Sequence, residues 1–445
     1  MRRAPLGQQH IVIAGAGLAG LTAARDLEMS GATITLIDAR DRVGGRVHTL
    51  RGFAGGHHVE GGADLIEGEQ TLVHDLAREV GLKPTRILRR GFGYYGPDRA
   101  GRHRIHRAPA AFEEAAERLA PLITEYRASG RDWDSPVARA IARQSVAGWL
   151  RATRAPRDFA AAMRGLRGFF LADPEDLSLL ALVDQFAQDG SPGDDAMFRL
   201  PQGNDTLPRA LQERLRGRVL LETTVRRIRT SKDAVRITVE GRNGLHEIAA
   251  AYFISAIPAT TLTDVEFDPP LPADQQRAIR LLQYGRATRV VLHFARRFWR
   301  RPARPRAFGT PLPIGAVWEG NEQQRGAAGF LTLLAGGAAS PAVREIIGRA
   351  GMHGLVRHLA WLGRPAKLLD ARTVTWEDDP WARGGYAYFD PAFDPRLRGW
   401  LSRPAGRVVF AGEHTSHRWQ GYMNGAIESG RRAAAEIRAL VALDA

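Results

Sequence analysis

Apolar residues follow two spacings along this chain. Short apolar runs bounded by glycine or polar residues indicate buried strands at 11–14, 252–255 and 408–411, and "TITLI" at 33–37 indicates a further strand. Apolar positions at helical spacing predict that most of 111–190 is helical. The first two strands enclose a helical stretch, and a strand–helix–strand unit is typical of a parallel sheet. The pattern therefore predicts an α/β fold.

Sheet-like sequence occurs at the start, in the middle and at the end of the chain, with two unlike insertions between these parts. We expect one discontinuous nucleotide-binding domain from 1–84, 201–283 and 403–445. The insertions, 85–200 and 284–402, are expected to form a second domain that combines a helical part with a sheet. No internal repeat or low-complexity stretch interrupts this arrangement.

Composition excludes several classes of protein. The 445 residues suffice for two or three domains, and contents of 44% hydrophobic and 25% charged residues are those of an ordinary globular protein. No apolar run approaches about 18 residues and the start lacks a signal-peptide pattern, so we expect a cytoplasmic protein without membrane attachment. The chain has no cysteine, which excludes disulfides and thiol chemistry.

The formal net charge of +15 changes this picture little. Only three of the 63 basic side chains are lysines, and the arginines are dispersed along the chain. No nucleic-acid-binding motif surrounds them, so we interpret the charge as a solvated, arginine-rich surface and expect no nucleic-acid partner.

The first predicted strand runs into a glycine pattern. Gly15, Gly17 and Gly20 fit G-x-G-x-x-G between a strand and a helix, the arrangement that lets a backbone approach a pyrophosphate. The following helix offers unpaired N–H groups to the phosphates. Asp38, at the end of the second strand, is placed to accept the ribose hydroxyls. These features predict a dinucleotide site without choosing between FAD and NAD.

The continuation "DARDRVGGRVHT" adds Gly44, Gly45 and Arg46. With "EGGADLIEGEQTLVHDLAREVGL" (60–82), "LPQGNDTLPRALQERL" (200–215), "ETTVRRI" (222–228), "WEDDPWARGGYAYFDP" and "VVFAGEHTSHRWQGYMNGAIESG", it resembles the FAD-dependent amine oxidases, the family of monoamine, polyamine and L-amino-acid oxidases. The resemblance spans nearly the whole chain. It implies a Rossmann-type FAD-binding domain joined to a mixed α+β substrate domain.

The resemblance also explains a second nucleotide-type corner near the C-terminus. The first corner would hold the adenosine and pyrophosphate of FAD, and the second the ribityl chain and flavin ring. Glu413 matches the family's acid near the ribityl or pyrophosphate region, and a helix starting near Gly421 would point its N–H groups at the flavin. The implied FAD-binding residues are Gly15, Ala16, Gly17, Ala19, Gly20, Asp38, Ala39, Arg40, Gly44, Gly45, Arg46, Gly61, Gly62, Ala63, Val225, Gly412, Glu413, Gly421, Tyr422 and Met423.

On the substrate side, the resemblance points to four residues. Tyr422 matches one aromatic wall of the family's amine cage, and Tyr388 is the candidate for the other. Arg289 stands where many relatives have a lysine that holds water near flavin N5, and it keeps the charge without readily losing a proton. Asp64 stands where amino-acid oxidases commonly have arginine; a carboxylate there would repel a substrate carboxylate and attract a cation, unless it caps a turn.

The implied reaction is oxidation of a small-molecule amine to an imine, with O2 reoxidising the flavin to give H2O2. The alternatives are an L-amino-acid oxidase, a flavin desaturase or dehydrogenase of the same superfamily, which Arg289 favours, and a flavin-binding scaffold without turnover. We expect non-covalent FAD, because cysteine is absent and Tyr386 occupies the attachment position of covalent relatives. A homodimer stays open.

Two histidine-containing stretches have spacings that metal sites also use. They are "GGHHVEGG", with His57, His58 and Glu60, and "GEHTSHRW", with His414 and His417. Each lies within a segment that matches the flavin-binding pattern, so we expect no metal site.

Overall fold

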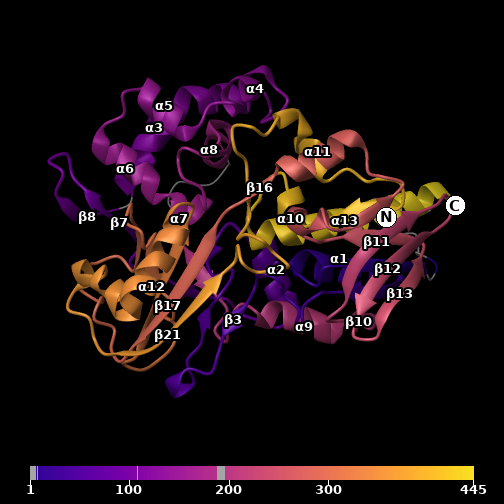
Figure 1. The fold of residues 1–445 in the computed structure, drawn as a ribbon, viewed down its shortest axis with the longest axis horizontal. Coiled ribbons are helices and arrows are strands. Elements are labelled where there is room, and N and C mark those ends of the chain that lie inside the picture. Colours follow the sequence, from indigo (N-terminus) through magenta and orange to yellow (C-terminus); the bar gives the residue numbers. More distant parts are fainter. Residues whose placement is uncertain (1–6, 8, 108, 188–195, 445) are drawn as a thin grey trace.

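The computed structural model describes residues 7, 9–107, 109–187 and 196–444; the basic tip of the chain lies outside these ranges. A five-stranded parallel sheet with the order β10-β2-β1-β14-β23 forms one half of the molecule (Figure 1). Its strands are β1 (His10–Ala14), β2 (Thr33–Ile37), β10 (Arg218–Leu220), β14 (Tyr252–Ser255) and β23 (Val408–Phe410). The parallel sheet that the apolar runs predicted is thus confirmed.

Both faces of this sheet are covered, which explains why its strands are mainly apolar. On one face, Ile11 and Ile13 of β1 pack against helices α1 (Leu18–Glu28) and α13 (Met423–Asp444). On the other face, Val12 and Ala14 meet a four-stranded sheet with the order β13-β12-β11-β15. Its strands are β11 (Thr224–Thr230), β12 (Val235–Gly241), β13 (Gly244–Ala250) and β15 (Glu266–Asp268).

A seven-stranded sheet with the order β21-β17-β20-β19-β18-β7-β8 organises the other half of the molecule. Helix α12 (Ala339–Arg357) packs on its central strands through Val343 and Leu355. The strands are β7 (Phe92–Pro97), β8 (His103–Arg107), β17 (Ala287–Phe294), β18 (Ala307–Gly309), β19 (Ala316–Glu319), β20 (Gly329–Gly336) and β21 (Leu368–Thr375).

A group of helices lies beyond this sheet, at the top left of Figure 1. It confirms the helical character predicted for 111–187, while residues 188–190 of that prediction lie outside the described ranges, and its own apolar core includes Leu119, Trp149 and Leu180. The helices are α3 (Pro109–Ala128), α4 (Pro136–Ala142), α5 (Val146–Ala152), α6 (Arg157–Gly165), α7 (Arg167–Phe170) and α8 (Leu179–Phe186).

Short elements connect the two halves of the molecule. They form the small sheets β3-β4, β5-β9-β6 and β16-β22, and several lie beside the cavity described below. The strands are β3 (Thr49–Leu50), β4 (Val59–Glu60), β5 (Ile66–Glu67), β6 (Thr85–Ile87), β9 (Met197–Arg199), β16 (Gln283–Tyr284) and β22 (Ala387–Tyr388). The remaining helices are η1 (Ala54–Gly56), α2 (Thr71–Glu79), α9 (Thr206–Arg214), α10 (Ala259–Leu262), α11 (Ala273–Leu281), η2 (Ala360–Leu362), η3 (Pro395–Leu401) and η4 (Glu413–Thr415).

No helix within the described ranges is both long and apolar enough to cross a membrane.

Candidate active site

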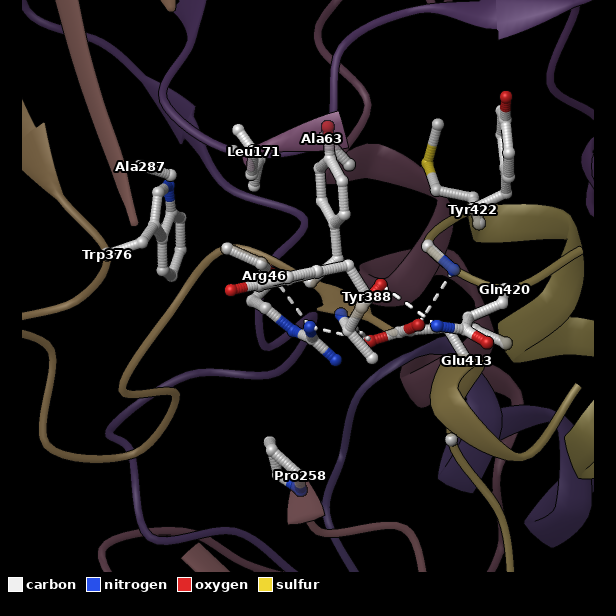
Figure 2. A pocket seen from close by; sticks show the side chains of 18 of the residues that line it. Arg46, Ala63, Leu171, Pro258, Ala287, Trp376, Tyr388, Glu413, Gln420 and Tyr422 are labelled. Carbon is white, nitrogen blue, oxygen red and sulfur yellow. Dashed lines mark hydrogen bonds and ion pairs between the residues drawn. The ribbon is translucent and has the colours of Figure 1, made fainter. Parts of the chain in front are cut away.

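Both glycine-containing corners open into one cavity of about 510 Å³. The N-terminal corner contributes Gly15 and Gly17, and the C-terminal corner contributes Gly412 and Glu413. Figure 2 shows Arg46 bonded to Glu413, with Trp376 and Tyr422 on opposite sides of them. Segments almost 400 residues apart thus form a single binding space. A long ligand could contact both corners at once.

The N-terminal corner has the features that a dinucleotide needs. Helix α1 begins at Leu18, and its N-cap, Gly17, supplies no side-chain hydrogen bond to the first turn. Asp38 follows β2 and is held in place by the backbone N–H groups of Ala16 (2.7 Å) and Arg40 (2.8 Å). Burial raises the pKa of the Asp38 carboxyl. The carboxylate retains lone pairs for ribose hydroxyls.

The three glycines of the motif have different environments. A Cβ on Gly20 would lie 1.9 Å from the carbonyl oxygen of Gly15, and one on Gly15, whose φ is +102°, would lie 2.7 Å from the carbonyl oxygen of Ala256. A Cβ on Gly17 would have no protein atom within 4 Å. Gly15 and Gly20 therefore serve packing, whereas Gly17 leaves room for a ligand.

The C-terminal corner is tied together by Glu413, which is buried. One carboxylate oxygen accepts from Nη1 of Arg46 (2.9 Å), and the other accepts from the backbone N–H of Gly421 (2.7 Å). The same Nη1 also donates to the carbonyl oxygen of Gly385 (2.7 Å). Directly and through Arg46, Glu413 thus connects the loops that contain Arg46, Gly385 and Gly421. The sequence did not indicate this role.

Helix α13 starts at Met423, directly after the Gly421–Tyr422 position that the sequence suggested. The two amides just before the helix are already used, because Gly421 donates to Glu413 and Tyr422 donates to the carbonyl oxygen of Trp419 (3.2 Å). Gly421 has a φ of +84°, which turns the chain into the helix.

Most of the predicted cofactor residues line the cavity, but three do not. Ala16 is fully buried, Gly20 packs on Gly15, and the N–H of Gly61 donates to the carbonyl oxygen of His48. These three residues support the cofactor-binding corners by packing and backbone hydrogen bonds, without lining the cavity. The predicted residues that line the cavity are Gly15, Gly17, Ala19, Asp38, Ala39, Arg40, Gly44, Gly45, Arg46, Gly62, Ala63, Val225, Gly412, Glu413, Gly421, Tyr422 and Met423.

Arg40 lines the cavity but directs its guanidinium elsewhere. Its two terminal nitrogens each donate to Asp379 at 2.7 Å, so the side chain links the loop after β2 to the loop after β21. Its backbone N–H, which binds Asp38, is the part of Arg40 that shapes the cofactor corner.

Asp64 differs from the unpaired carboxylate that the sequence suggested. Its Oδ1 accepts from Nε of Arg199 (2.7 Å), and its Oδ2 accepts from Nη1 of Arg289 (3.2 Å) and from Nε1 of Trp318 (2.8 Å). The positive charges of two guanidinium groups thus offset the negative charge of the Asp64 carboxylate. The repulsion of a substrate carboxylate that we expected from Asp64 loses its physical basis, as does a simple turn-capping role.

Arg289 is buried on β17, with 5% of its surface exposed, and it lines the cavity. Its Nη1 also donates to the carbonyl oxygen of Glu60 (3.1 Å), and its guanidinium lies 5.1 Å from the ring centroid of Trp318. The Nε atom has no hydrogen-bond partner among the described residues. Burial lowers the pKa of this guanidinium, although Asp64 and Glu60 oppose the shift.

The two tyrosines beside Ala387, Tyr386 and Tyr388, both line the cavity. Burial raises the pKa of Tyr386, and the charges that act on this phenol are those of Arg289 and Glu413. Tyr388 also lines the cavity, but burial raises its pKa to about 12 with contributions from the charges of Asp176 and Asp390. The sequence singled out Tyr388 because the spacing alone could not orient this segment.

Sequence reasoning also missed Arg199, Trp318 and Trp376. Arg199 and Trp318 bind Asp64, and Trp376 lines the cavity while donating from Nε1 to the carbonyl oxygen of Gly61 (3.1 Å). Only Trp376 lies in a motif that had been singled out, "WEDDPW". The other two are visible only once distant strands come together.

Within the described part of the chain, no group of three or more His, Asp or Glu side chains is arranged to hold a metal ion. Burial lowers the pKa of His414 to about 3, with further lowering by Arg46 and Arg398, and the pKa of His417 to about 4. These histidines are therefore neutral at pH 7.

Glu60 makes stability depend on pH. Burial, followed by the charge of Asp64, raises its pKa to about 8, so the folded protein holds a proton that the unfolded chain releases near pH 4.5. Its stabilising effect is complete below pH 4.5 and is lost as the pH rises through 8. Between pH 5 and 9, urea unfolding should show the wild type losing at least about 1 kcal/mol more than Glu60→Gln. Equal losses in both proteins would contradict this.

Comparisons with known proteins agree with the geometry. A family model for flavin-containing amine oxidoreductases matches residues 18–438. The flavin-dependent L-tryptophan oxidase RebO of Lentzea aerocolonigenes is 28% identical, with 98% of this chain and 99% of the relative covered. Amine oxidase B of Cavia porcellus is 27% identical over 96% of this chain and 85% of the relative.

Solved structures show the same fold. Cyclohexylamine oxidase from Brevibacterium oxydans superimposes with a TM-score of 0.85, at 23% identity, over 98% of this chain and all of that one. The cavity, with an open Gly17, an acid at the end of β2 and a second corner around Glu413, fits FAD, the family's cofactor. This chain belongs to the flavin-containing amine oxidoreductases.

Proposed function

We propose that this enzyme oxidises a neutral primary or secondary amine at the carbon next to nitrogen. FAD, when bound, takes a hydride equivalent from that carbon and passes the electrons to O2, which yields H2O2. The imine is hydrolysed by water to a carbonyl compound and an amine or ammonia. The observation that supports this proposal best is the single cavity that joins both FAD corners to Tyr386, Tyr422 and Arg289.

Within this proposal, Tyr386 and Tyr422 form the two aromatic walls beside the flavin. The two phenols influence each other electrostatically, and burial raises the pKa of Tyr422 well above its ordinary value. A Cβ on Gly421, the residue before Tyr422, would lie 3.3 Å from the ring of Tyr386. Both phenols stay protonated, so the walls are neutral and accommodate an uncharged amine. In this arrangement Tyr388 lines the cavity beside the two walls.

The remaining cavity wall on the side of the larger sheet is mainly apolar, which favours substrates with an aryl or alkyl body. Charged groups in this part of the cavity are Asp64, Glu67 and Arg289. Apolar and aromatic residues of the wall include Phe92, Tyr94, Met163, Leu166, Phe170, Met197, Phe308, Trp318 and Leu334.

Anaerobic flavin bleaching tests the proposed reaction. The FAD-loaded enzyme would be mixed with 2-phenylethylamine, hexylamine and 1,6-diaminohexane, and with L-phenylalanine. We expect bleaching by at least one amine, followed by stoichiometric H2O2 when air is admitted. If none of the amines bleaches the flavin, the proposal fails.

L-Amino-acid oxidation is the second candidate, and the paired state of Asp64 favours it more than the sequence did. Because Arg199 and Arg289 offset the Asp64 charge, the site does not reject a substrate carboxylate. The relative RebO is named as an L-tryptophan oxidase. Faster bleaching by L-phenylalanine than by 2-phenylethylamine would establish this reaction.

Arg289 distinguishes an oxidase from a dehydrogenase. Arginine stays charged at working pH, whereas lysine can change its protonation state while holding water. We expect amine-driven reduction to be faster than reoxidation, and Arg289→Lys to accelerate reoxidation more than it changes reduction. Stopped-flow mixing of the reduced enzyme with O2 measures both rates. If wild-type reoxidation is faster and the lysine variant is identical, Arg289 does not lie at the reactive edge.

The attachment of FAD can be tested directly. The chain has no cysteine, and the hydroxyl of Tyr386 donates a hydrogen bond to the carbonyl oxygen of Phe169. We therefore expect acid denaturation to release all the FAD. Flavin absorbance remaining with the precipitated polypeptide would contradict non-covalent binding.

We further propose a cytoplasmic location, a homodimer, and a division into an FAD-binding domain (1–84, 201–283, 403–445) and a substrate-binding domain (85–200, 284–402). Light scattering of the FAD-loaded protein tests the dimer, and cell fractionation tests the location. Limited proteolysis should cut first at the domain junctions.

A further inference from the structure

The Asp64 carboxylate binds two arginines in different ways. Arg199 uses both Nε (2.7 Å) and Nη2 (2.5 Å) toward Oδ1, whereas Arg289 uses only Nη1 (3.2 Å) toward Oδ2. Both contacts of Arg199 are shorter than the contact of Arg289, although only the Nε of Arg199 has hydrogen-bond geometry, and the closer approach makes Arg199 the stronger partner of Asp64. The negative charge of Asp64 therefore compensates mainly the positive charge of Arg199.

Arg199 is fully buried and does not line the cavity. Its remaining terminal nitrogen donates to the carbonyl oxygen of Gly320 (2.7 Å) and to Oε1 of Gln323 (2.9 Å). These contacts hold the guanidinium behind Asp64, on the side away from the cavity. Arg199 thus has no direct route to a substrate or to FAD.

Arg289 is in the opposite situation, because it lines the cavity and keeps an Nε–H without a hydrogen-bond partner among the described residues. Two cations share one carboxylate here. Since Arg199 takes most of the Asp64 charge, one positive charge remains on the cavity side. A cation in a dry cavity interacts strongly with any charge that appears beside it.

We propose that Arg199 is a positioning residue that withdraws the Asp64 carboxylate from Arg289 and so keeps Arg289 as an uncompensated cation toward bound FAD. Without Arg199, Asp64 is free to pair fully with Arg289 and to cancel its charge. The inference rests on the proposed function in one respect, the placement of Arg289 at the reactive edge of the flavin. It assigns a role to a side chain that touches neither substrate nor cofactor.

The reduction potential of bound FAD measures the effect, because reduction adds negative charge to the ring. Arg199→Gln should lower the potential by about 30 mV, a tenfold change in a two-electron equilibrium. Asp64→Asn should change the potential in the opposite direction, since Arg289 then loses the one carboxylate that it contacts among the described residues. Affinity for sulfite, which adds to oxidised flavin as an anion, should fall in the first variant and rise in the second.

Arg51→Gln is the matched control. Arg51 also binds one aspartate through two nitrogens, both at 2.7 Å from Asp205, and it does not line the cavity. Its loss should leave the potential unchanged. Arg199→Lys, which keeps the charge but not the paired contact, should lie between the wild type and Arg199→Gln and covers the case in which glutamine prevents folding.

The inference would be overturned if the reduction potential shifted in the same direction in Arg199→Gln and Asp64→Asn. It would also be overturned if Arg51→Gln shifted the potential as much as Arg199→Gln does. An unchanged potential in Asp64→Asn, a variant that removes charge without changing side-chain size, would overturn it as well. The potential is measured by dye-coupled chemical reduction without substrate. Failure here therefore leaves amine oxidation intact, and failure of every amine to bleach the flavin leaves the potential measurement intact.

Discussion

Gly17→Val should yield a folded protein that has lost FAD. A Cβ at Gly17 meets no protein atom within 4 Å, and the residue's φ of −73° is open to valine. The new side chain would instead occupy the space that the pyrophosphate needs. We expect affinity for FAD to fall at least 100-fold, about 2.8 kcal/mol, with the urea midpoint of the FAD-free protein unchanged.

Gly348→Val controls for the substitution itself, because Gly348 in helix α12 also has no atom within 4 Å of the added carbon but lies outside the cavity lining. It should bind FAD as the wild type does. Gly20→Ala provides the opposite case: its Cβ would collide with the carbonyl oxygen of Gly15, so the fold itself should weaken. Full flavin occupancy in Gly17→Val would show that the pyrophosphate lies elsewhere.

Glu413→Gln should reduce both FAD binding and the stability of the FAD-free protein. The buried carboxylate pairs with Arg46 at 2.9 Å and accepts from Gly421 at 2.7 Å. Its loss leaves the Arg46 guanidinium, whose side chain is 22% exposed, without a counter-charge among the described residues, and the cost should stay below the about 3–5 kcal/mol of removing one member of a fully buried pair. Urea unfolding without FAD, together with flavin titration, separates the two effects.

Glu436→Gln is a suitable control, since Glu436 pairs with Arg432 at 2.8 Å one turn away on the half-exposed face of α13. That change should lower the free energy of unfolding by no more than about 1 kcal/mol. If Glu413→Gln lost FAD but kept full stability without it, the carboxylate would act only on the cofactor. Its contacts with Arg46 and Gly421 would then be dispensable.

The elements that the sequence predicted best are those specified by neighbouring residues. The parallel strands β1, β14 and β23 are mainly apolar because both faces of the sheet are covered, and β2 alternates threonine with isoleucine and leucine. The G-x-G-x-x-G motif runs from the end of β1 into the first turn of α1. Such features depend on local patterns, so the sequence could indicate them directly.

Placement of individual side chains was less predictable. Choosing between Tyr386 and Tyr388 requires knowing how a two-residue strand, β22, lies against β16 and the C-terminal corner. The start of α13 at Met423 depends on Glu413, which uses the Gly421 amide that would otherwise extend the free end of the helix. Both outcomes are set by contacts between distant segments.

The sequence by itself determined the class of this protein: a glycine-rich turn and an acid after the second strand indicate a dinucleotide site, and the resemblance of further motifs to the FAD-dependent amine oxidases indicates FAD and amine oxidation. Only the tertiary structure decided the charge of the site. Arg199, Arg289 and Trp318 are 135, 225 and 254 residues from Asp64, and they come from strands β9, β17 and β19. A carboxylate's effect depends on the charges within a few ångströms of it, and those distances exist only in the folded chain.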